Sequence, residues 1–234
     1  MKNKLSPPSL AHLVAASLCI VAAQASAQDA KAGDAAAGQK KADMCIGCHG
    51  IPGYQASFPE VYKVPKIAGQ GSKYIVAALN GYKKGERRHP SMRGIAGSLS
   101  DQDMADLAAY FEQLGKTAGD AGVEKVSTKA DAPLPAPPPE VAKLLAQANC
   151  ASCHGANFSQ PIDPSYPKLA GQYADYLYAA LKAYQVEHNQ VLGRSNAIMM
   201  GMARPFTRPE IKALAQYISS LPGDLKTVAQ SRFR

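Results

Sequence analysis

Apolar residues recur along most of this chain at the spacing of an amphipathic helix. In a segment that begins at Ser72, a predicted N-cap, they stand at positions i, i+3, i+4 and i+7. These residues are Ile75, Ala78, Leu79 and Tyr82. The same spacing returns in the second half of the chain at Leu177, Ala180, Leu181 and Tyr184. No stretch alternates apolar and polar residues convincingly, so the pattern predicts an all-α fold.

Two further predicted helices begin with a capping box, in which a hydroxyl residue and an acidic residue three positions later cap each other. Ser100 and Asp103 open the first of these helices, and Thr207 and Glu210 open the second. Their apolar faces consist of Met104, Leu107, Ala108 and Phe111, and of Ile211, Leu214, Ala215 and Ile218. Shorter helices are predicted upstream, at residues 35–44 and 141–148.

The matched helices belong to an internal repeat. A Cys-x-x-Cys-His-Gly segment at 45–50 recurs 105 residues later at 150–155, and a Pro-Lys-x-Ala-Gly-Gln segment at 65–70 recurs 102 residues later at 167–172. Further along, an offset of 107 pairs Met92 with Met199 and Leu99 with Phe206. This period is too long for a solenoid and has the size of a small domain, so it predicts two tandem domains.

Composition places the ends of these domains. Residues 1–27 combine a basic start, an apolar run and an Ala-x-Ala cleavage pattern, which together predict a secretory signal peptide that is removed. The apolar run is shorter than the ~20 residues that a membrane anchor needs. Residues 117–139 are small and polar and then rich in proline, which predicts an extended linker. We therefore expect domains at 28–116 and 140–234.

Aromatic side chains are few for a chain of this length. Hydrophobic residues make up 46% of the chain, but aromatic residues only 7%, and tryptophan is absent. Aromatic side chains usually supply much of a core, so a flat bound cofactor is a candidate to fill this one.

The cysteines decide the chemistry. Cys45 and Cys48 precede His49, and the same pattern returns in the second domain with Cys150, Cys153 and His154. Two cysteines three apart can add their thiols to the vinyl groups of one haem, and the adjacent histidine then ligates the iron. Four cysteines of an exported protein could instead form two disulfides, but the spacing and the histidines argue against this. The sequence predicts two covalently bound haem c groups.

The sixth iron ligand should occupy matched positions in both domains. His89 aligns with Asn196, so histidine does not qualify, and among the methionines only Met92 and Met199 form a pair. We interpret Met104 and Met202 as packing residues, although Met200 and Met202 are close enough to Met199 to compete for the iron. The predicted iron ligands are His49, Met92, His154 and Met199.

Pro65 and Pro167 follow the two haem motifs. A ligating histidine normally donates its other ring N–H to an acceptor, and the carbonyl of each proline is a candidate. A plain turn proline is an equally good interpretation of both residues.

A basic cluster stands just before Met92. It consists of Lys83, Lys84, Arg87 and Arg88, and the aligned stretch of the second domain has no such cluster. It is a landing site for an acidic redox partner, a solvated basic loop, or a source of two charges that neutralise the haem carboxylates.

These motifs give the chain a clear resemblance. It resembles the class I c-type cytochromes and, as a tandem pair, the dihaem cytochromes of the c4 type, over essentially the whole mature sequence. The Cys-x-x-Cys-His motifs, the Pro-Lys-x-Ala-Gly segments, Met92 and Met199 carry the resemblance. It implies two all-α domains, each wrapped around one low-spin haem with His/Met ligation. Two departures stand out: the linker is long and rich in proline, which argues against a tight haem-to-haem arrangement, and no glycine matches Gly38, where the first and last helices of a domain cross.

The resemblance implies a periplasmic electron carrier, not an enzyme. It would pass electrons from a cytochrome bc complex or a dehydrogenase to a terminal oxidase or another acceptor. We expect a monomer with redox protein partners and no nucleic acid, and association with a membrane surface stays open. The alternatives are a haem subunit of a dehydrogenase complex and a dihaem redox enzyme.

Overall fold

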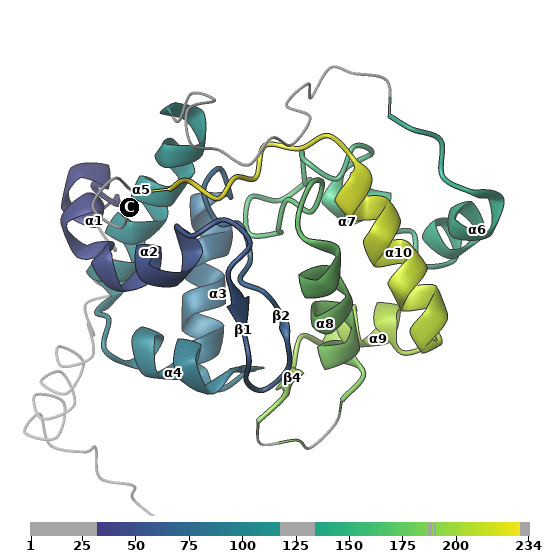
Figure 1. Cartoon of the computed structure of the whole chain (residues 1–234), viewed down its shortest axis with the longest axis horizontal. Coiled ribbons are helices and arrows are strands. Elements are labelled where there is room, and N and C mark those ends of the chain that lie inside the picture. Colours follow the sequence, from purple (N-terminus) through teal and green to yellow (C-terminus); the bar gives the residue numbers. More distant parts are fainter. Residues whose placement is uncertain (1–31, 118–133, 187–188, 190, 230–234) are drawn as a thin grey trace, which may run out of the picture. The chain divides into compact units, whose positions relative to one another are not determined.

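The computed structural model describes residues 32–117, 134–186, 189 and 191–229. The described chain consists mainly of helices, which follow one another in two groups (Figure 1). We call residues 32–117 the first half and residues 134–229 the second half. The predicted signal peptide and most of the predicted linker lie outside the described residues. The domain boundaries at 28–116 and 140–234 stay predictions.

Each half has the same order of helices. The first half contains α1 (Ala35–Lys41), α2 (Asp43–His49), β1 (Gln55–Ala56), β2 (Tyr62–Lys63), α3 (Ser72–Lys84), β3 (Arg87–Arg88), α4 (Pro90–Gly97) and α5 (Asp101–Thr117). The second half contains α6 (Pro139–Gln147), α7 (Ala151–His154), α8 (Ala174–Tyr184), β4 (Gly193–Arg194), α9 (Ala197–Ala203) and α10 (Arg208–Ser220). The predicted all-α class is confirmed, because the strands of the described residues are only two residues long.

The predicted helix starts are mostly correct. The carboxylate of Asp103 accepts from the N–H of Ser100 at 3.0 Å, and that of Glu210 accepts from the N–H of Thr207 at 2.7 Å, so both capping boxes are confirmed. The N-cap prediction for Ser72 is wrong, because Gly71 is the N-cap and Ser72 is the first residue of α3. Its N–H has a distant acceptor instead, the carboxylate of Glu112 on α5, at 3.1 Å.

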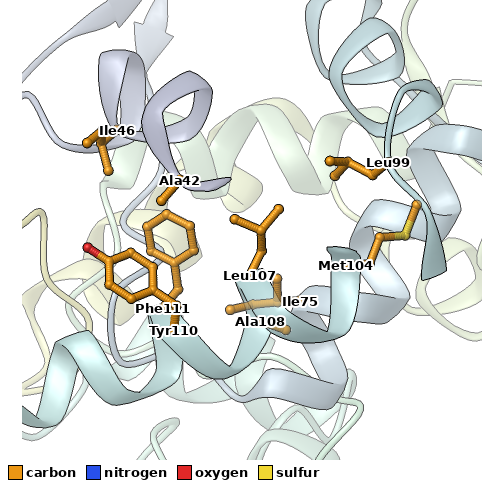
Figure 2. Close-up of a cluster of buried hydrophobic side chains, with 9 residues drawn as sticks. All are labelled: Ala42, Ile46, Ile75, Leu99, Met104, Leu107, Ala108, Tyr110 and Phe111. Carbon is orange, nitrogen blue, oxygen red and sulfur yellow. The ribbon is translucent and has the colours of Figure 1, made fainter. Parts of the chain in front are cut away.

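The core of the first half lies along one face of α5. Figure 2 shows Leu107 and Phe111 extending from this helix toward Ala42, at the junction of α1 and α2. Met104 on the same helix is fully buried, which confirms its predicted packing role. The same interpretation is wrong for Met202, whose side chain on the short helix α9 is 42% exposed.

Gly38 explains the close crossing of α1 and α5. A Cβ at this position would lie 2.1 Å from the backbone oxygen of Asp106, so only glycine allows this approach. The second half lacks the glycine and still packs α6 on α10, through Val141 and Leu144 against a cluster that includes Ile211. Side-chain packing thus replaces the backbone contact at the second crossing.

The two halves make direct contacts with each other. β3 pairs with β4 in antiparallel register, and residues 221–229 return from α10 to the first half, in yellow in Figure 1. In this returning segment the N–H of Lys226 donates to the carbonyl of Ala68 at 2.9 Å, and Leu225 is 1% exposed. The two halves thus pack against each other although the linker is long and rich in proline. Within the described residues, no helix has the length and apolar character needed to cross a membrane.

Candidate haem-binding sites

Each Cys-x-x-Cys-His motif lies on a short helix. α2 carries Cys45 and Cys48 one turn apart, and α7 begins directly after Cys150. Residues three apart on a helix share one side, which suits two thiols that must reach one ring. The structure forms no disulfide between the four cysteines of the described chain, and all four are free thiols.

Both motif histidines face a proline carbonyl. Nδ1 of His49 lies 2.8 Å from the carbonyl oxygen of Pro65, and Nδ1 of His154 lies 3.1 Å from that of Pro167. A carbonyl oxygen can only accept, so Nδ1 carries the proton in each ring and Nε2 keeps a lone pair for the iron. The predicted acceptor role of the two prolines is confirmed.

Burial prepares these side chains for their chemistry. It lowers the pKa of His49 and His154, although the hydrogen bond to each proline carbonyl acts in the opposite direction. Both rings are thereby kept neutral, the form that binds a metal. Burial also raises the pKa of the Cys45 thiol to about 11 and raises that of Cys150, so both remain protonated at neutral pH.

The two candidate methionine ligands occupy the same position in matched helices. Met92 is the third residue of α4, and its N–H faces Nδ1 of His89 at 3.4 Å. Met199 is the third residue of α9, and its N–H donates to the side-chain oxygen of Asn196 at 3.0 Å. Both methionines are half-buried. A histidine–methionine pair lies near each cysteine pair, but the individual ligand assignments stay predictions.

Arginines and tyrosines meet where the halves join. Arg87 donates to the hydroxyls of Tyr74 at 3.0 Å and Tyr176 at 3.3 Å, and Arg194 donates to Tyr176 at 3.1 Å. Burial would raise the pKa of Tyr176, but the two guanidiniums outweigh it and lower this pKa to about 8. The cluster therefore concentrates positive charge in a half-buried place between the halves.

The arginines of this cluster suit the carboxylates of a haem. Nε of Arg87 is buried without a hydrogen-bond partner, and none of the ion pairs between described residues involves Arg87 or Arg194. Each haem brings two carboxylates, which are the natural partners of such guanidiniums. The free thiols, the histidine tautomers and this unpaired charge together suit the cofactor.

The structure divides the basic cluster into two parts. Arg87 lies in the junction and Arg88 donates to the carbonyl of Asn189. Lys83 and Lys84 are both exposed, although Lys83 also donates to the carbonyl of Leu99 at 2.7 Å. The two arginines therefore have structural roles, and the landing site for a partner stays a prediction for the two lysines.

Sequence reasoning assigned no role to several residues of the junction. Arg194 and Tyr176 belong to the cluster just described, and Gln70 and Gln172 bind the opposite half, as detailed below. The repeat contained a usable signal, since Gln70 and Gln172 hold matched positions in the two domains. A polar residue repeated at matched positions of the two domains was the clue.

Comparison with known proteins agrees with this geometry. The cytochrome c family model matches the chain twice, at residues 35–115 and 140–222. Cytochrome c4 of Azotobacter vinelandii is 33% identical over 207 residues, which cover 81% of this chain and 90% of the relative. The crystal structure of reduced recombinant cytochrome c4 from Pseudomonas stutzeri matches with a TM-score of 0.56 and 29% identity, and covers 81% of this chain and 100% of that chain.

A second group of relatives has a more specific description. A thiosulfate dehydrogenase electron acceptor of Stutzerimonas stutzeri is 29% identical over 185 residues, which cover 76% of this chain and 78% of the relative. Both groups share the two-domain extent of this chain.

Proposed function

Since the chain belongs to the cytochrome c family, as a two-domain protein of the cytochrome c4 type, we propose that it carries electrons in the periplasm between a respiratory donor and a terminal acceptor. The cofactors are two haem c groups, and the chain is a dihaem electron carrier, not an enzyme. The donor is a cytochrome bc complex or a dehydrogenase, and the acceptor is a terminal oxidase or another oxidant.

In this proposal each half holds one haem with the same set of side chains. Cys45 and Cys48 form the thioether bonds in the first half, where His49 and Met92 are the iron ligands. In the second half the corresponding residues are Cys150, Cys153, His154 and Met199. The bound iron supplies a one-electron couple, and a thioether ligand favours its reduced state. The chain fixes the positions of these ligands.

The observation that carries the proposal is the matched construction of the two sites. Each motif histidine donates from Nδ1 to a proline carbonyl, at 2.8 Å for His49 and 3.1 Å for His154. Matched methionines at the third position of α4 and α9 would supply the second protein ligand of each iron. An iron with no open ligand position would exchange electrons without binding a substrate, which is what a carrier needs.

The dehydrogenase as donor has specific support. Among the relatives is a thiosulfate dehydrogenase electron acceptor, whose match to this chain is 29% identical and covers 76% of it. A dehydrogenase that oxidises a small sulfur compound is therefore a donor to test beside the cytochrome bc complex.

The test has three parts. Intact mass of the mature protein after denaturation should exceed that of the polypeptide cleaved after Ala27 by two haem groups, and a variant with Cys150 and Cys153 changed to alanine should exceed it by one. Periplasmic fractions should contain the cleaved form. Stopped-flow mixing should show reduction by a donor and oxidation by oxidase-containing membranes; a protein that neither donor reduces would contradict the proposal.

A further inference from the structure

One peptide group links each proximal histidine to the opposite half. The carbonyl of Pro65 accepts from Nδ1 of His49 at 2.8 Å. The N–H of the same peptide group belongs to Lys66, and it donates to the side-chain oxygen of Gln172 at 3.0 Å. A chain of two hydrogen bonds therefore runs from the histidine of the first half to a glutamine of the second.

The second half contains the mirror image of this chain. The carbonyl of Pro167 accepts from Nδ1 of His154 at 3.1 Å, and the N–H of the same peptide group, on Lys168, donates to the side-chain oxygen of Gln70 at 2.9 Å. Each half thus supplies the last acceptor of the other half's hydrogen-bond chain.

Both glutamines are held firmly in place. The amide nitrogen of Gln172 donates to the carbonyl of Lys66 at 2.9 Å, and that of Gln70 donates to the carbonyl of Lys168 at 3.0 Å. Each glutamine is 3% exposed. A glycine with positive φ precedes each one, Gly69 at +85° and Gly171 at +72°, and this turn directs the side chain across the junction.

The physical consequence follows from cooperativity between hydrogen bonds. An acceptor on the N–H of a peptide group polarises that group, so its carbonyl becomes a stronger acceptor. A stronger acceptor at Nδ1 raises the basicity of the imidazole at Nε2. A more basic ligand stabilises ferric iron and lowers the reduction potential.

From these contacts we propose that Gln172 lowers the potential of the haem in the first half, and that Gln70 lowers the potential of the haem in the second half. Both are positioning residues that act through a histidine of the opposite domain. The proposal rests on the ligand roles proposed above for His49 and His154. It gives the repeated Pro-Lys-x-Ala-Gly-Gln segment one function, since its proline holds one histidine and its glutamine tunes the other.

The crossed pattern separates tuning from a merely structural effect. In their own halves, the side-chain oxygens of Gln70 and Gln172 accept from the N–H of the following residue, Gly71 and Tyr173. A local disturbance around a substituted glutamine would therefore shift the potential of the haem in its own half. Loss of the hydrogen-bond chain would instead shift the potential of the haem in the opposite half.

The test uses Gln172→Met and Gln70→Met in the full-length holoprotein, because methionine is similar in length and cannot accept comparably from an N–H. Redox titration followed by NMR of the two ligand-methionine methyl groups gives one potential for each haem. Gln172→Met should raise the potential of the first-half haem, shift the Nδ1–H resonance of His49 and leave the second-half haem unchanged. Gln70→Met should do the reverse.

A second variant keeps the acceptor. Gln172→Glu retains an oxygen for the N–H of Lys66 and adds a negative charge, so it should lower the potential that Gln172→Met raises. If both variants raise it, or if each methionine variant shifts its own domain's haem, the inference is overturned. Absence of either protected Nδ1–H resonance in the unsubstituted protein would instead overturn the ligand roles themselves.

Discussion

At the scale of single residues, the orientation of each motif histidine depends on one carbonyl. Pro65 and Pro167 cannot donate through their own nitrogens, yet their carbonyls fix the tautomers of His49 and His154. The same proline therefore shapes the local chain and sets the tautomer of the proposed iron ligand. Each proposed methionine ligand is placed differently, by its position in a short helix.

The methionine assignment in the second half can be tested by substitution. Met199→Ala should abolish the weak near-infrared band of ferric methionine-ligated haem for one of the two haems and lower that haem's potential, because the thioether ligand is lost. Met202→Ala is the matched control, since this side chain is 42% exposed and its removal should change stability by no more than about 0.5 kcal/mol. Loss of the band in the Met202 variant alone would show that the alignment of the second half is shifted.

The residues that the sequence predicted share one property. His49, Pro65 and Met104 are recognisable from a motif, from its repetition or from a helical face, all of which are local. Gln172 was missed because its partner Lys66 lies in the other half, and Arg194 because its strand β4 pairs with β3 of the other half; no local spacing records either pairing. Met202 was misjudged because an apolar side chain does not by itself fix how far the short helix α9 is exposed.

Asp106 makes the stability of the first half sensitive to acid. Its carboxylate is 3% exposed and accepts from the N–H of Asp34 at 2.9 Å and from Nζ of Lys41 at 2.8 Å. The Asp34 N–H is the largest cause that holds the Asp106 pKa below its usual range, followed by Lys41, against the opposing effect of burial. Because the folded pKa is lower than the unfolded one, the carboxylate stabilises the fold above pH ~4 and this contribution is lost as pH falls.

Asp106→Asn should therefore lower the free energy of unfolding at pH 7 by about 1–3 kcal/mol and flatten its fall between about pH 5 and 3. Denaturant titrations at pH 7, 5 and 3 measure both effects. Asp101→Asn, an exposed residue of the same helix, is the control and should retain the pH dependence. An Asp106 variant with the full acid sensitivity would contradict this account.

At the scale of elements, α1 and the residues just before it lie very close to the backbone of α5. Gly33 and Gly38 both approach the backbone of α5, where a Cβ would lie 2.0 Å and 2.1 Å from a carbonyl oxygen. The predicted helix at 35–44 is divided here, with α1 ending at Lys41 and α2 beginning at Asp43. Helical periodicity predicted the apolar face correctly but not this break, because the break is imposed by packing on α5.

Gly38→Ala tests that crossing. The added methyl would meet the carbonyl of Asp106, and neither backbone can yield easily, so the free energy of unfolding should fall by about 1–3 kcal/mol despite the better helix propensity of alanine. The matched control is Lys143→Ala, at the aligned position of α6, where the side chain is exposed. Denaturant midpoints measure both changes, and equal effects in the two variants would show that the crossing is not limited by the glycine.

At the scale of the whole molecule, the two domains form their most polar contacts where they face each other. The β3–β4 pairing, the arginine–tyrosine cluster and the two glutamines all lie at this junction. The long linker pointed toward independent domains, but the length of a linker sets only how far domains can separate. Whether they separate depends on the surfaces that meet.

This junction predicts that the two halves unfold together. Residues 221–229 bind the second half to the first through Lys226, and Leu225 is 1% exposed within this segment. Unfolding followed by far-UV circular dichroism and by the near-infrared haem band should give coincident transitions, because neither half can lose its structure without exposing the shared surface.

Leu225→Ala in combination with Gln70→Ala and Gln172→Ala removes apolar packing and both glutamine contacts. The transitions should then separate and the first should begin at lower denaturant, whereas Lys143→Ala should leave them coincident. Two separate transitions in the unsubstituted protein would mean that the contacts between the halves contribute little to stability.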